Sequence, residues 1–580
     1  MNVKTNSKPK ADGWKALFGT LHRLRLPWLW IVSGLALNII LNDLMLDLPD
    51  TTAELTGGNL SGTTFAKVVG FYVVIGIMSF VSMIGQTQAQ TYSVLRARRS
   101  IWNKMLGMKM SFFASNDPSN LISTITNDAN AAVTDFVNCI LYLIPDIYYV
   151  VAALKRIGEY HYILLLSCLA VIPLKYLYAF FMGRKYQSAS AALYGKIGVL
   201  TGFLADRINH LPLIKAYTNE KSEEDVGKDA SKKILDANMK LVHLDNIALA
   251  ASSLLDILQK FIVVVVAVVL LQQNKIDLTM WLAFFLFAQN LFPNIDEVFD
   301  IWIKIKAMHG SFHRVIEIMD GESESRDGTL PFPNEGDIRF EDVSFTYPET
   351  HRPALSHVSF SLKRGDHLAI VGLCGSGKTT TISLLERFYT QNEGKIFIGD
   401  TDIRDISLGE FRKNFAYVQQ GAEIFSGTLR DALTYGIERE ISDEEINEAA
   451  ARTGFYEYLR LCENGLDTEV TAGGTSMSGG QSQRLVLTRE LLRGGNIVLM
   501  DEPTSALDVR ISAKVQDTMD KVFKDKTRIL ITHDLQLAQK YDRILVMKEG
   551  RLVGDGTHDE LMKTCETYIE MNQEAEVAAV

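Results

Sequence analysis

The stretch Gly372-Leu-Cys-Gly-Ser-Gly-Lys378-Thr379 decides the fold of the C-terminal half of this chain. It has the form G-x-x-x-x-G-K-[ST], in which backbone N–H groups of a glycine-rich loop surround phosphate groups. Residues 367–371 before it are apolar, as in a buried strand, and residues 379–387 after it have the character of a helix. Loop amides and a helix N-terminus together attract a polyphosphate. The stretch therefore predicts a strand, a phosphate-binding loop and a helix in succession.

The side chains of this loop have distinct expected roles. Lys378 is expected to reach the outer phosphates, and the Thr379 hydroxyl is expected to bind Mg²⁺. A glycine-rich turn of this form can also arise by chance, but the flanking strand and helix favour phosphate binding. The residues expected to contact the nucleotide here are Gly372, Cys374, Gly375, Ser376, Gly377, Lys378, Thr379 and Thr380.

A second motif, at residues 496–502, is an apolar run that ends in Asp501 and Glu502. A continuous apolar run is typical of a buried parallel strand, and open parallel sheets present their ligands at the carboxyl ends of the strands. Asp501 is expected to hold Mg²⁺ through water, and Glu502 to polarise the water that attacks the γ-phosphate. Taken alone, an apolar strand that ends in Asp-Glu more often marks only the point where the strand reaches the protein surface. The phosphate loop upstream favours a catalytic pair.

Between these motifs, residues 477–481 read Met-Ser-Gly-Gly-Gln and open a helix-like stretch at residues 482–489. This array resembles the nucleotide-binding domain of ABC transporters, in which the S-G-G-Q signature separates the family from other phosphate-loop ATPases. The resemblance implies that ATP and Mg²⁺ are bound and that ATP is hydrolysed. In the membrane half it extends to the exporter-type (type IV) members, so it covers nearly the whole chain.

The resemblance also implies roles for residues outside these motifs. Tyr347 matches the aromatic residue that stacks on adenine, and Gln420 matches the glutamine that senses Mg²⁺ and touches the membrane domain. Asp508, in Ser505-Ala-Leu-Asp508, matches the D-loop, and His533 matches the switch histidine at the γ-phosphate. Taken one at a time, Tyr347 could be an ordinary aromatic residue in a turn, Gln420 an ordinary amide in a loop and His533 an ordinary histidine at a strand end. The order of all these motifs along the chain favours the functional roles. The implied catalytic residues are Glu502, His533 and Gln420, and the implied metal ligands are Thr379, Gln420 and Asp501.

The signature implies a dimer. In the family, the signature residues of one copy close over ATP held on the phosphate loop of a second copy. Because the ATP-site residues of this chain are intact, a homodimer is favoured, although a partner chain with a degenerate site is compatible with them. The signature residues expected to contact the partner's ATP are Ser478, Gly479, Gly480 and Gln481.

The composition excludes several classes of protein. The chain has 580 residues, 47% of them hydrophobic, and a net charge of −10, which argues against a general nucleic-acid binder. Its five cysteines are scattered without a C-x-x-C pair, so neither a disulfide framework nor a zinc site is expected.

Six apolar segments in the first 300 residues approach the roughly 20 residues needed to span a bilayer. The third and sixth are weaker and could be buried helices of a soluble domain, but an even number of spans returns the chain to the side of the ATPase. The expected spans are residues 28–45, 65–84, 136–154, 162–182, 247–271 and 278–292.

Basic residues gather in the N-terminal arm and in the stretches after the second and fourth spans, whereas residues 48–61 contain acids and no Lys or Arg. The positive-inside rule therefore places both termini and the ATPase in the cytoplasm, with the chain in the cell membrane, most simply a bacterial plasma membrane. Lys155 and Arg156, in an expected outer loop, do not fit this orientation.

The inner segments, residues 88–134 and 183–246, are too long for simple connectors. Within them, residues 111–128 and 211–217 resemble the loops that carry the coupling helices of exporter-type members. The expected parts of the chain are an N-terminal arm (1–26), a membrane domain (27–320), a linker (321–336) and the ATPase domain (337–580). Ala472 departs from the family, because the resemblance places a coupling glutamate there.

These observations predict two kinds of fold in one chain. One is an all-α membrane domain of six long helices, and the other is an α/β phosphate-loop ATPase domain with an antiparallel β subdomain and a helical subdomain. The implied function is ATP-driven transport by alternating access, by default export of a lipid, peptide or hydrophobic small molecule. The alternatives are an importer with the exporter-type fold, for example of a metal chelate, and a membrane-anchored ATPase without cargo.

Several polar residues lie inside the expected spans, among them Asn38, Asn42, Lys175 and Asp256. Ionisable groups within a membrane are candidates for cargo contacts, whereas asparagines serve equally well to pair helices. Asp146, beside Pro145, is the candidate cargo contact on this ground.

Overall fold

The computed structural model describes residues 13–53, 62–116, 118–333, 335–419, 421–471, 477–504 and 509–578. The chain forms two compact units. Unit 1 comprises Met1–Leu106 and Pro118–Gly321, and unit 2 comprises Gly107–Asp117 and Glu322–Val580. The short segment 107–117 thus belongs with the C-terminal unit, although it lies between two parts of the first.

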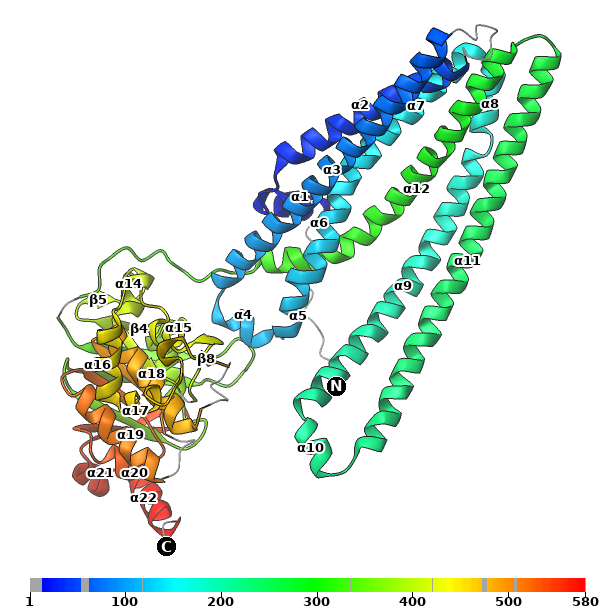
Figure 1. Cartoon of the computed structure of the whole chain (residues 1–580). Helices are drawn as coiled ribbons and strands as arrows, with labels where there is room; N and C mark the ends of the chain where they lie inside the picture. The colour runs from blue at the N-terminus through cyan, green and yellow to red at the C-terminus, as the bar shows by residue number, and fades with distance from the viewer. Residues whose placement is uncertain are drawn as a thin grey trace. The chain divides into compact units, whose positions relative to one another are not determined.

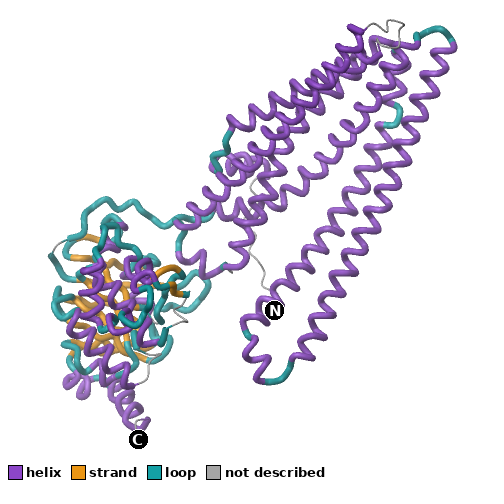
Figure 2. The backbone as a smooth tube through the Cα atoms, viewed as in Figure 1, coloured by secondary structure: helices purple, strands orange, loops and turns teal. Residues whose placement is uncertain are grey.

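In its described residues, the secondary structure of unit 1 consists of helices joined by short loops (Figures 1 and 2). Six helical stretches of this unit are long and apolar enough to cross a membrane, which confirms the expected number of spans. The helices are α1 (Gly13–Arg23), α2 (Trp28–Ala53), α3 (Gly62–Leu106), α5 (Pro118–Ser123), η1 (Thr124–Asp128), α6 (Ala129–Asn138), η2 (Cys139–Leu143), α7 (Ile144–Tyr160), α8 (Tyr162–Leu169), α9 (Ile172–Asn209), α10 (Leu211–Ala216), α11 (Glu220–Gln272) and α12 (Leu278–Asp320).

Four of these helices are much longer than a bilayer requires. α3 has 45 residues, α9 has 38, α11 has 53 and α12 has 43, against roughly 20 for one crossing. α9 and α11 pack side by side, and the six-residue helix α10 lies where they meet (Figure 1). The spans therefore continue as helices beyond the membrane, as the long inner segments predict.

The third span is irregular at two points, because the π-helical turns η1 and η2 interrupt it. Pro145 follows η2 directly and stands in the first turn of α7. Such π-turns are local widenings of a helix and are frequent near functional positions.

Unit 2 contains all the paired strands of the described chain (Figure 2). A six-stranded sheet has the order β12-β11-β3-β10-β9-β6 and is parallel except for the edge strand β12, and a four-stranded antiparallel sheet has the order β2-β1-β4-β5. The strands are β1 (Ile338–Phe345), β2 (Leu355–Leu362), β3 (His367–Gly372), β4 (Glu393–Ile398), β5 (Thr401–Asp402), β6 (Phe415–Val418), β7 (Gly427–Thr428), β8 (Glu469–Val470), β9 (Ile497–Asp501), β10 (Thr527–Ile531), β11 (Arg543–Lys548) and β12 (Arg551–Gly556).

Some helices of unit 2 share an apolar core with the six-stranded sheet, and the helices of the helical subdomain share another core. The helices of unit 2 are α4 (Met110–Ser115), α13 (Lys378–Leu385), α14 (Leu408–Lys413), α15 (Leu429–Thr434), α16 (Asp443–Thr453), α17 (Tyr456–Leu459), η3 (Gly465–Asp467), α18 (Gly479–Arg493), α19 (Val509–Val522), α20 (Leu535–Ala538), α21 (His558–Thr564) and α22 (Glu566–Ala578). The expected α/β domain with an antiparallel part and a helical part is therefore present.

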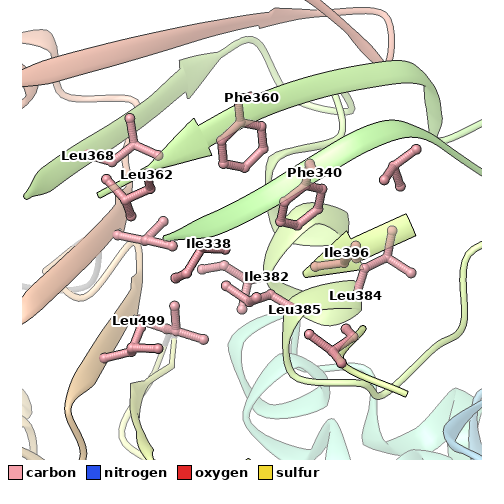
Figure 3. Packing of buried hydrophobic residues seen from close by; sticks show 14 of the residues in the cluster. Ile338, Phe340, Phe360, Leu362, Leu368, Ile382, Leu384, Leu385, Ile396 and Leu499 are labelled. Atoms are coloured by element: carbon pink, nitrogen blue, oxygen red, sulfur yellow. The ribbon is translucent and has the colours of Figure 1, made fainter. Parts of the chain in front are cut away.

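One apolar core joins the two sheets of this unit. Phe340 and Phe360 of the antiparallel sheet, whose rings stack 4.5 Å apart, share the core with Leu499 of β9 and Ile382 of α13 (Figure 3). A second core on the other face contains Val486 of α18 and other side chains from α19, α21 and α22. Helix α13, which follows the phosphate loop, is therefore held by the interior of the domain.

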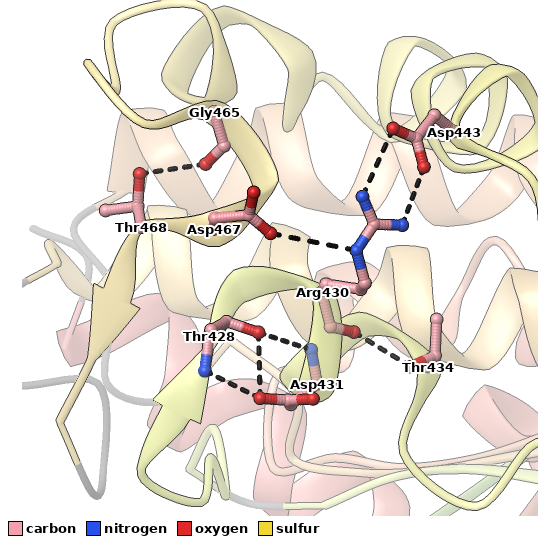
Figure 4. Close-up of polar contacts among 8 residues, drawn as sticks. All are labelled: Thr428, Arg430, Asp431, Thr434, Asp443, Gly465, Asp467 and Thr468. Carbon is pink, nitrogen blue, oxygen red and sulfur yellow. Dashed lines mark hydrogen bonds and ion pairs between the residues drawn. The ribbon is translucent and has the colours of Figure 1, made fainter.

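The helical subdomain has its own apolar core, and it is also stabilised by hydrogen bonds and an ion pair. Thr428 caps α15 in a reciprocal box with Asp431, and Arg430 forms an ion pair of 2.6 Å with Asp443 (Figure 4). A capping box satisfies two N–H groups at the start of a helix that lack helical partners. These contacts fix the direction of α15, which packs against the signature helix α18.

The segment 107–117 is tied to the chain after α12. Met108 and Ser323 form an isolated antiparallel bridge, and the Lys109 ammonium lies 2.6 Å from the Glu322 carboxylate. Further along, Glu324 pairs with Arg412 at 2.5 Å, and Phe332 enters the core between the sheets. The residues that follow α12 are therefore anchored in unit 2.

Candidate active site

The phosphate loop connects the end of β3 to the start of α13. Gly377 caps α13 with φ of 103°, a left-handed conformation that glycine adopts without steric cost. A Cβ atom on Gly377 would lie 2.6 Å from the Ala354 carbonyl oxygen, and one on Gly372 would lie 2.3 Å from the Met547 oxygen. Both positions therefore need glycine because other backbone segments approach them closely.

Lys378 lies buried inside the loop. Its Nζ atom donates hydrogen bonds to the carbonyl oxygens of Gly372 at 2.8 Å and Leu373 at 3.2 Å. An ammonium group has three N–H donors, so one remains for a phosphate oxygen. The buried Ser376 hydroxyl has no hydrogen-bond partner among the residues that the structure describes. A glycine cradle with an ammonium group and an unpaired hydroxyl fits a bound polyphosphate.

The expected metal ligands Thr379 and Asp501 lie side by side. The Thr379 hydroxyl is 3.5 Å from Asp501 Oδ1, at the outer limit of a hydrogen bond. Burial raises the pKa of Asp501 above its usual range, the Thr379 hydroxyl and Lys378 oppose this rise, and Glu502 adds to it. A bound cation would favour the ionised carboxylate. Carboxylate and hydroxyl oxygens are ligands that Mg²⁺ prefers, so this pair fits that ion.

Glu502 and His533 meet beside this pair. The Glu502 Oε1 atom is 3.4 Å from His533 Nδ1, and the Glu502 backbone N–H donates to the Ile531 carbonyl at 2.9 Å. Glu502 has φ of 43°, a conformation that is uncommon for residues other than glycine and that is found at functional sites. The turn after β9 thus directs the carboxylate toward the end of β10.

The sheet topology explains why these residues converge. Strands β3, β10 and β9 are neighbours and run parallel. The carboxyl ends of neighbouring parallel strands lie on one edge of the sheet. The structure therefore brings together five of the expected site residues, which are Lys378, Thr379, Asp501, Glu502 and His533.

Tyr347 lies at the first turn of α13. Its hydroxyl is 3.1 Å from the Thr380 Oγ1 atom, and its ring makes edge contacts with Phe345 at 4.9 Å and Tyr389 at 5.0 Å. The ring is therefore fixed beside the phosphate loop by two other aromatic rings. Tyr389 is a neighbour that the sequence patterns do not single out, since only the fold brings it to Tyr347.

The signature residues form the N-terminus of α18. Ser478 caps the helix by accepting a hydrogen bond from the Gln481 N–H, and the Gln481 side chain accepts one from the Ser478 N–H. A Cβ atom on Gly480 would lie 2.6 Å from the Ile511 side chain, so glycine permits the close packing of α19. Among the described residues, no hydrogen bond joins Ser478–Gln481 to the phosphate loop of the same chain.

Three residues with expected roles lie outside the described part of the chain. These are Gln420, Asp508 and Ala472. The structure adds a residue that the sequence patterns missed. Tyr417 of β6 is close enough to Asp501 for the carboxylate to raise the pKa of its phenol, after the larger effect of burial.

The polar residues of the spans fall into paired and unpaired groups. Lys175 of α9 is buried and lies 2.7 Å from Asp256 of α11 and 2.8 Å from Asp296 of α12. Asp146 is buried at 6% exposure, its Oδ2 atom has no hydrogen-bond partner in the described part of the chain, and Glu297 is close enough to interact with it electrostatically. No Lys or Arg among the described residues pairs with Asp146 or Glu297.

Comparison with known proteins identifies both halves of the chain. The family described as "ABC transporter" matches residues 355–505, and the family described as "ABC transporter transmembrane region" matches residues 28–294. A protein of Vibrio vulnificus (strain YJ016) named ATP-dependent lipid A-core flippase is 28% identical over 510 residues, which are 87% of each chain. A protein of the same name from Mannheimia succiniciproducens is 26% identical over 579 residues, which are 98% of this chain and 99% of the other.

The fold also matches a solved structure, described as a bacterial Atm1-family ABC exporter with ATP bound. The two share a TM-score of 0.78 and 22% sequence identity, over 98% of this chain and 99% of the other.

Proposed function

The chain belongs to the ABC transporter family, and we propose that it exports an amphipathic, lipid-type molecule. It is a half-transporter, in which one membrane part and one ATPase part are fused in a single chain. It is a multi-pass membrane protein that couples ATP hydrolysis to transport. The lipid-type cargo is proposed because the similar proteins are named flippases. Their names do not favour the importer alternative.

The observation that carries the proposal is the convergence of Lys378, Thr379, Asp501, Glu502 and His533 at one edge of a sheet, in a chain with six helices able to span a membrane. Lys378 and Ser376 would hold the phosphates, and Tyr347 would pack against the base. Thr379 and Asp501 would hold Mg²⁺, which when bound neutralises phosphate charge. Glu502 would orient the attacking water and accept its proton, and His533 would stay in contact with the Glu502 carboxylate.

We expect the working unit to be a dimer. The signature end of α18 makes no hydrogen bond to the phosphate loop of its own chain among the described residues. In the proposal, Ser478 of each copy closes over ATP held by the other, and the closure reaches the spans through short helices such as α10. Two identical chains suffice because each supplies an intact set of site residues.

Reconstitution into proteoliposomes with a fluorescent lipid probe tests the function. MgATP added outside reaches only copies whose ATPase faces outward, so export appears as movement of the probe from the outer to the inner leaflet. The Glu502→Gln variant is the matched control and should move no probe. Movement in the opposite direction would support an importer, and hydrolysis that no cargo stimulates would support an ATPase without transport.

A further inference from the structure

A basic cavity lies where the N-terminal helix meets the first span. Its volume is about 540 Å³, within the range of ligand pockets. Among the residues that the structure describes, the lining includes four side chains that carry or can carry a positive charge and no acidic side chain. The lining residues are His22, Arg23, Arg25, Leu26, Trp28 and Arg96.

The chain builds this cavity from a tight turn that α3 holds in place. α1 ends at Arg23, α2 begins at Trp28, and Arg25 between them has φ of 53°. A left-handed arginine is strained by about 1 kcal/mol or more, and such strain gathers at ligand sites. Two side chains of α3 donate hydrogen bonds to backbone carbonyls of this turn. Arg96 donates to the Arg25 carbonyl at 3.5 Å, and Ser100 donates to the Leu24 carbonyl at 3.1 Å.

The charges of the cavity are only partly compensated. Arg23 pairs with Asp320 at 2.5 Å and also donates to the Met319 carbonyl. Arg25 and Arg96 have no carboxylate partner among the described residues, and both are exposed. Each guanidinium has five N–H donors. Arg96 donates one of its five to the Arg25 carbonyl. Two arginines therefore keep most of their donors for an anion.

The surroundings of the cavity have the character of a membrane–water interface. Trp28, Leu29 and Trp30 are exposed at the start of the first span, and Phe18 is exposed on α1. The Trp30 ring stacks on the Tyr92 ring at 5.4 Å. Aromatic belts lie at the level of the lipid headgroups, and a short helix with one apolar face lies in the plane of the interface. The arginines are therefore placed at headgroup level, with apolar side chains beside them.

We propose that Arg25 and Arg96, with His22, bind the phosphate headgroup of an anionic phospholipid in the leaflet that faces the ATPase. A guanidinium binds two phosphate oxygens at once, and Trp28 offers an apolar wall for the start of the acyl chains. The site lies outside the ATP site and does not depend on which cargo is moved. A bound headgroup fixes α1 against α3 and so stabilises the folded membrane part.

A lipid-binding experiment tests the site. The full-length protein is placed in zwitterionic nanodiscs, phosphatidylglycerol is added in increasing amounts, and native mass spectrometry counts the phosphatidylglycerol molecules bound to the protein. Arg25→Gln and Arg96→Gln should each weaken binding about fivefold, as expected for one basic residue near a charged lipid surface. Arg99→Gln removes the same charge from an exposed position of α3 outside the cavity and should leave binding unchanged. Thermal stability should rise with phosphatidylglycerol in the parent and in Arg99→Gln, and much less in the two cavity variants.

Equal lipid binding by Arg25→Gln, Arg96→Gln and the parent would overturn the proposal. So would an equal loss in Arg99→Gln, because the attraction would then come from general surface charge. Inorganic phosphate is the second arm of the experiment. If phosphate alone stabilises the parent and phosphatidylglycerol does not, the cavity takes a free anion and the lipid assignment is wrong.

Discussion

The Asn38 side chain of α2 donates a hydrogen bond of 2.6 Å to the main-chain carbonyl of Leu141 in the third span. Leu141 stands four residues before Pro145, which has no N–H to complete the α-helical pattern. Asn38 also accepts hydrogen bonds from Ser82 and Gln86 of α3 through its Oδ1 atom. One asparagine therefore satisfies a carbonyl that a proline deprives of its helical partner, and it joins three spans in doing so.

This relationship predicts an interaction between two substitutions. Asn38→Ala should destabilise the membrane part by about 1 kcal/mol, the upper range for polar contacts between spans. In a Pro145→Ala background the same change should cost less, because the introduced alanine restores an N–H for the Leu141 carbonyl. Thermal unfolding of the four proteins in detergent measures the difference.

The control for this cycle is Asn42, which donates to the Pro145 carbonyl at 2.9 Å. Pro145→Ala keeps that carbonyl, so Asn42→Ala should cost the same in both backgrounds. Equal costs of Asn38→Ala with and without Pro145 would contradict the assigned role of Asn38.

Glu502→Gln should abolish steady-state hydrolysis while ATP binding persists. The amide keeps the shape of the side chain but cannot accept a proton, so copies should accumulate closed around ATP. Lys378→Ala should instead weaken ATP binding, because it removes the ammonium group held inside the loop. Measurement of nucleotide binding and turnover on both variants separates the two effects. Turnover near the parental rate in Glu502→Gln would mean that another group activates water.

N-ethylmaleimide should inactivate the ATPase through Cys374. This thiol is exposed in the phosphate loop, whereas Cys168 and Cys565 are buried. An adduct there would occupy the space of the phosphates, so MgATP should slow the inactivation. Cys374→Ser should stay active and become resistant. Sensitivity that persists in this variant would point to Cys462 or Cys139, which are both partly exposed.

Asp146→Asn should change the apparent affinity for a cationic or polar cargo while basal hydrolysis persists. The reason is that Asp146 is buried next to Glu297 without a basic partner among the described residues, whereas Lys175 is held by two aspartates. Asp256→Asn is the matched control, since Lys175 keeps Asp296. Cargo concentrations that half-maximally stimulate the ATPase measure the effect. The same values for parent and Asp146→Asn would assign Asp146 to helix packing.

Glu386 should make the ATPase domain less stable as the pH rises from about 4.5 to about 7. Burial raises its pKa to about 7, Arg412 and Arg493 oppose this rise, and Glu490 adds to it. In this window the unfolded chain releases the proton and the folded chain keeps it, so stability falls with pH and then levels off. Glu386→Gln should therefore raise the unfolding temperature above pH 7 and leave it nearly unchanged at about pH 4.5.

Exposed Glu393 provides the control for this prediction. Glu393→Gln should leave the pH dependence as it is in the parent. A parallel loss of stability with pH in the parent and in Glu386→Gln would show that other groups cause it.

The local motifs of the ATPase and the apolar spans were predictable from the sequence. A phosphate loop is contiguous in the sequence, and its strand and helix flank it directly. Residues 367–387 therefore contain everything that is needed to recognise the loop. A span needs only about 20 apolar residues in succession. The end of β9 at Asp501 and the six spanning helices follow the patterns for this reason.

Features that depend on counterions and partners far away in the chain emerged only in the tertiary structure. Arg156, whose charge does not fit an outer loop, lies in α7 and pairs with Asp47 at 2.7 Å and Asp50 at 2.8 Å. Lys175 was recognisable as an ionisable residue in a span, but its two aspartates come from other helices. The energy of a buried charge depends on what lies within a few ångströms of it, and only the packing of the helices decides that.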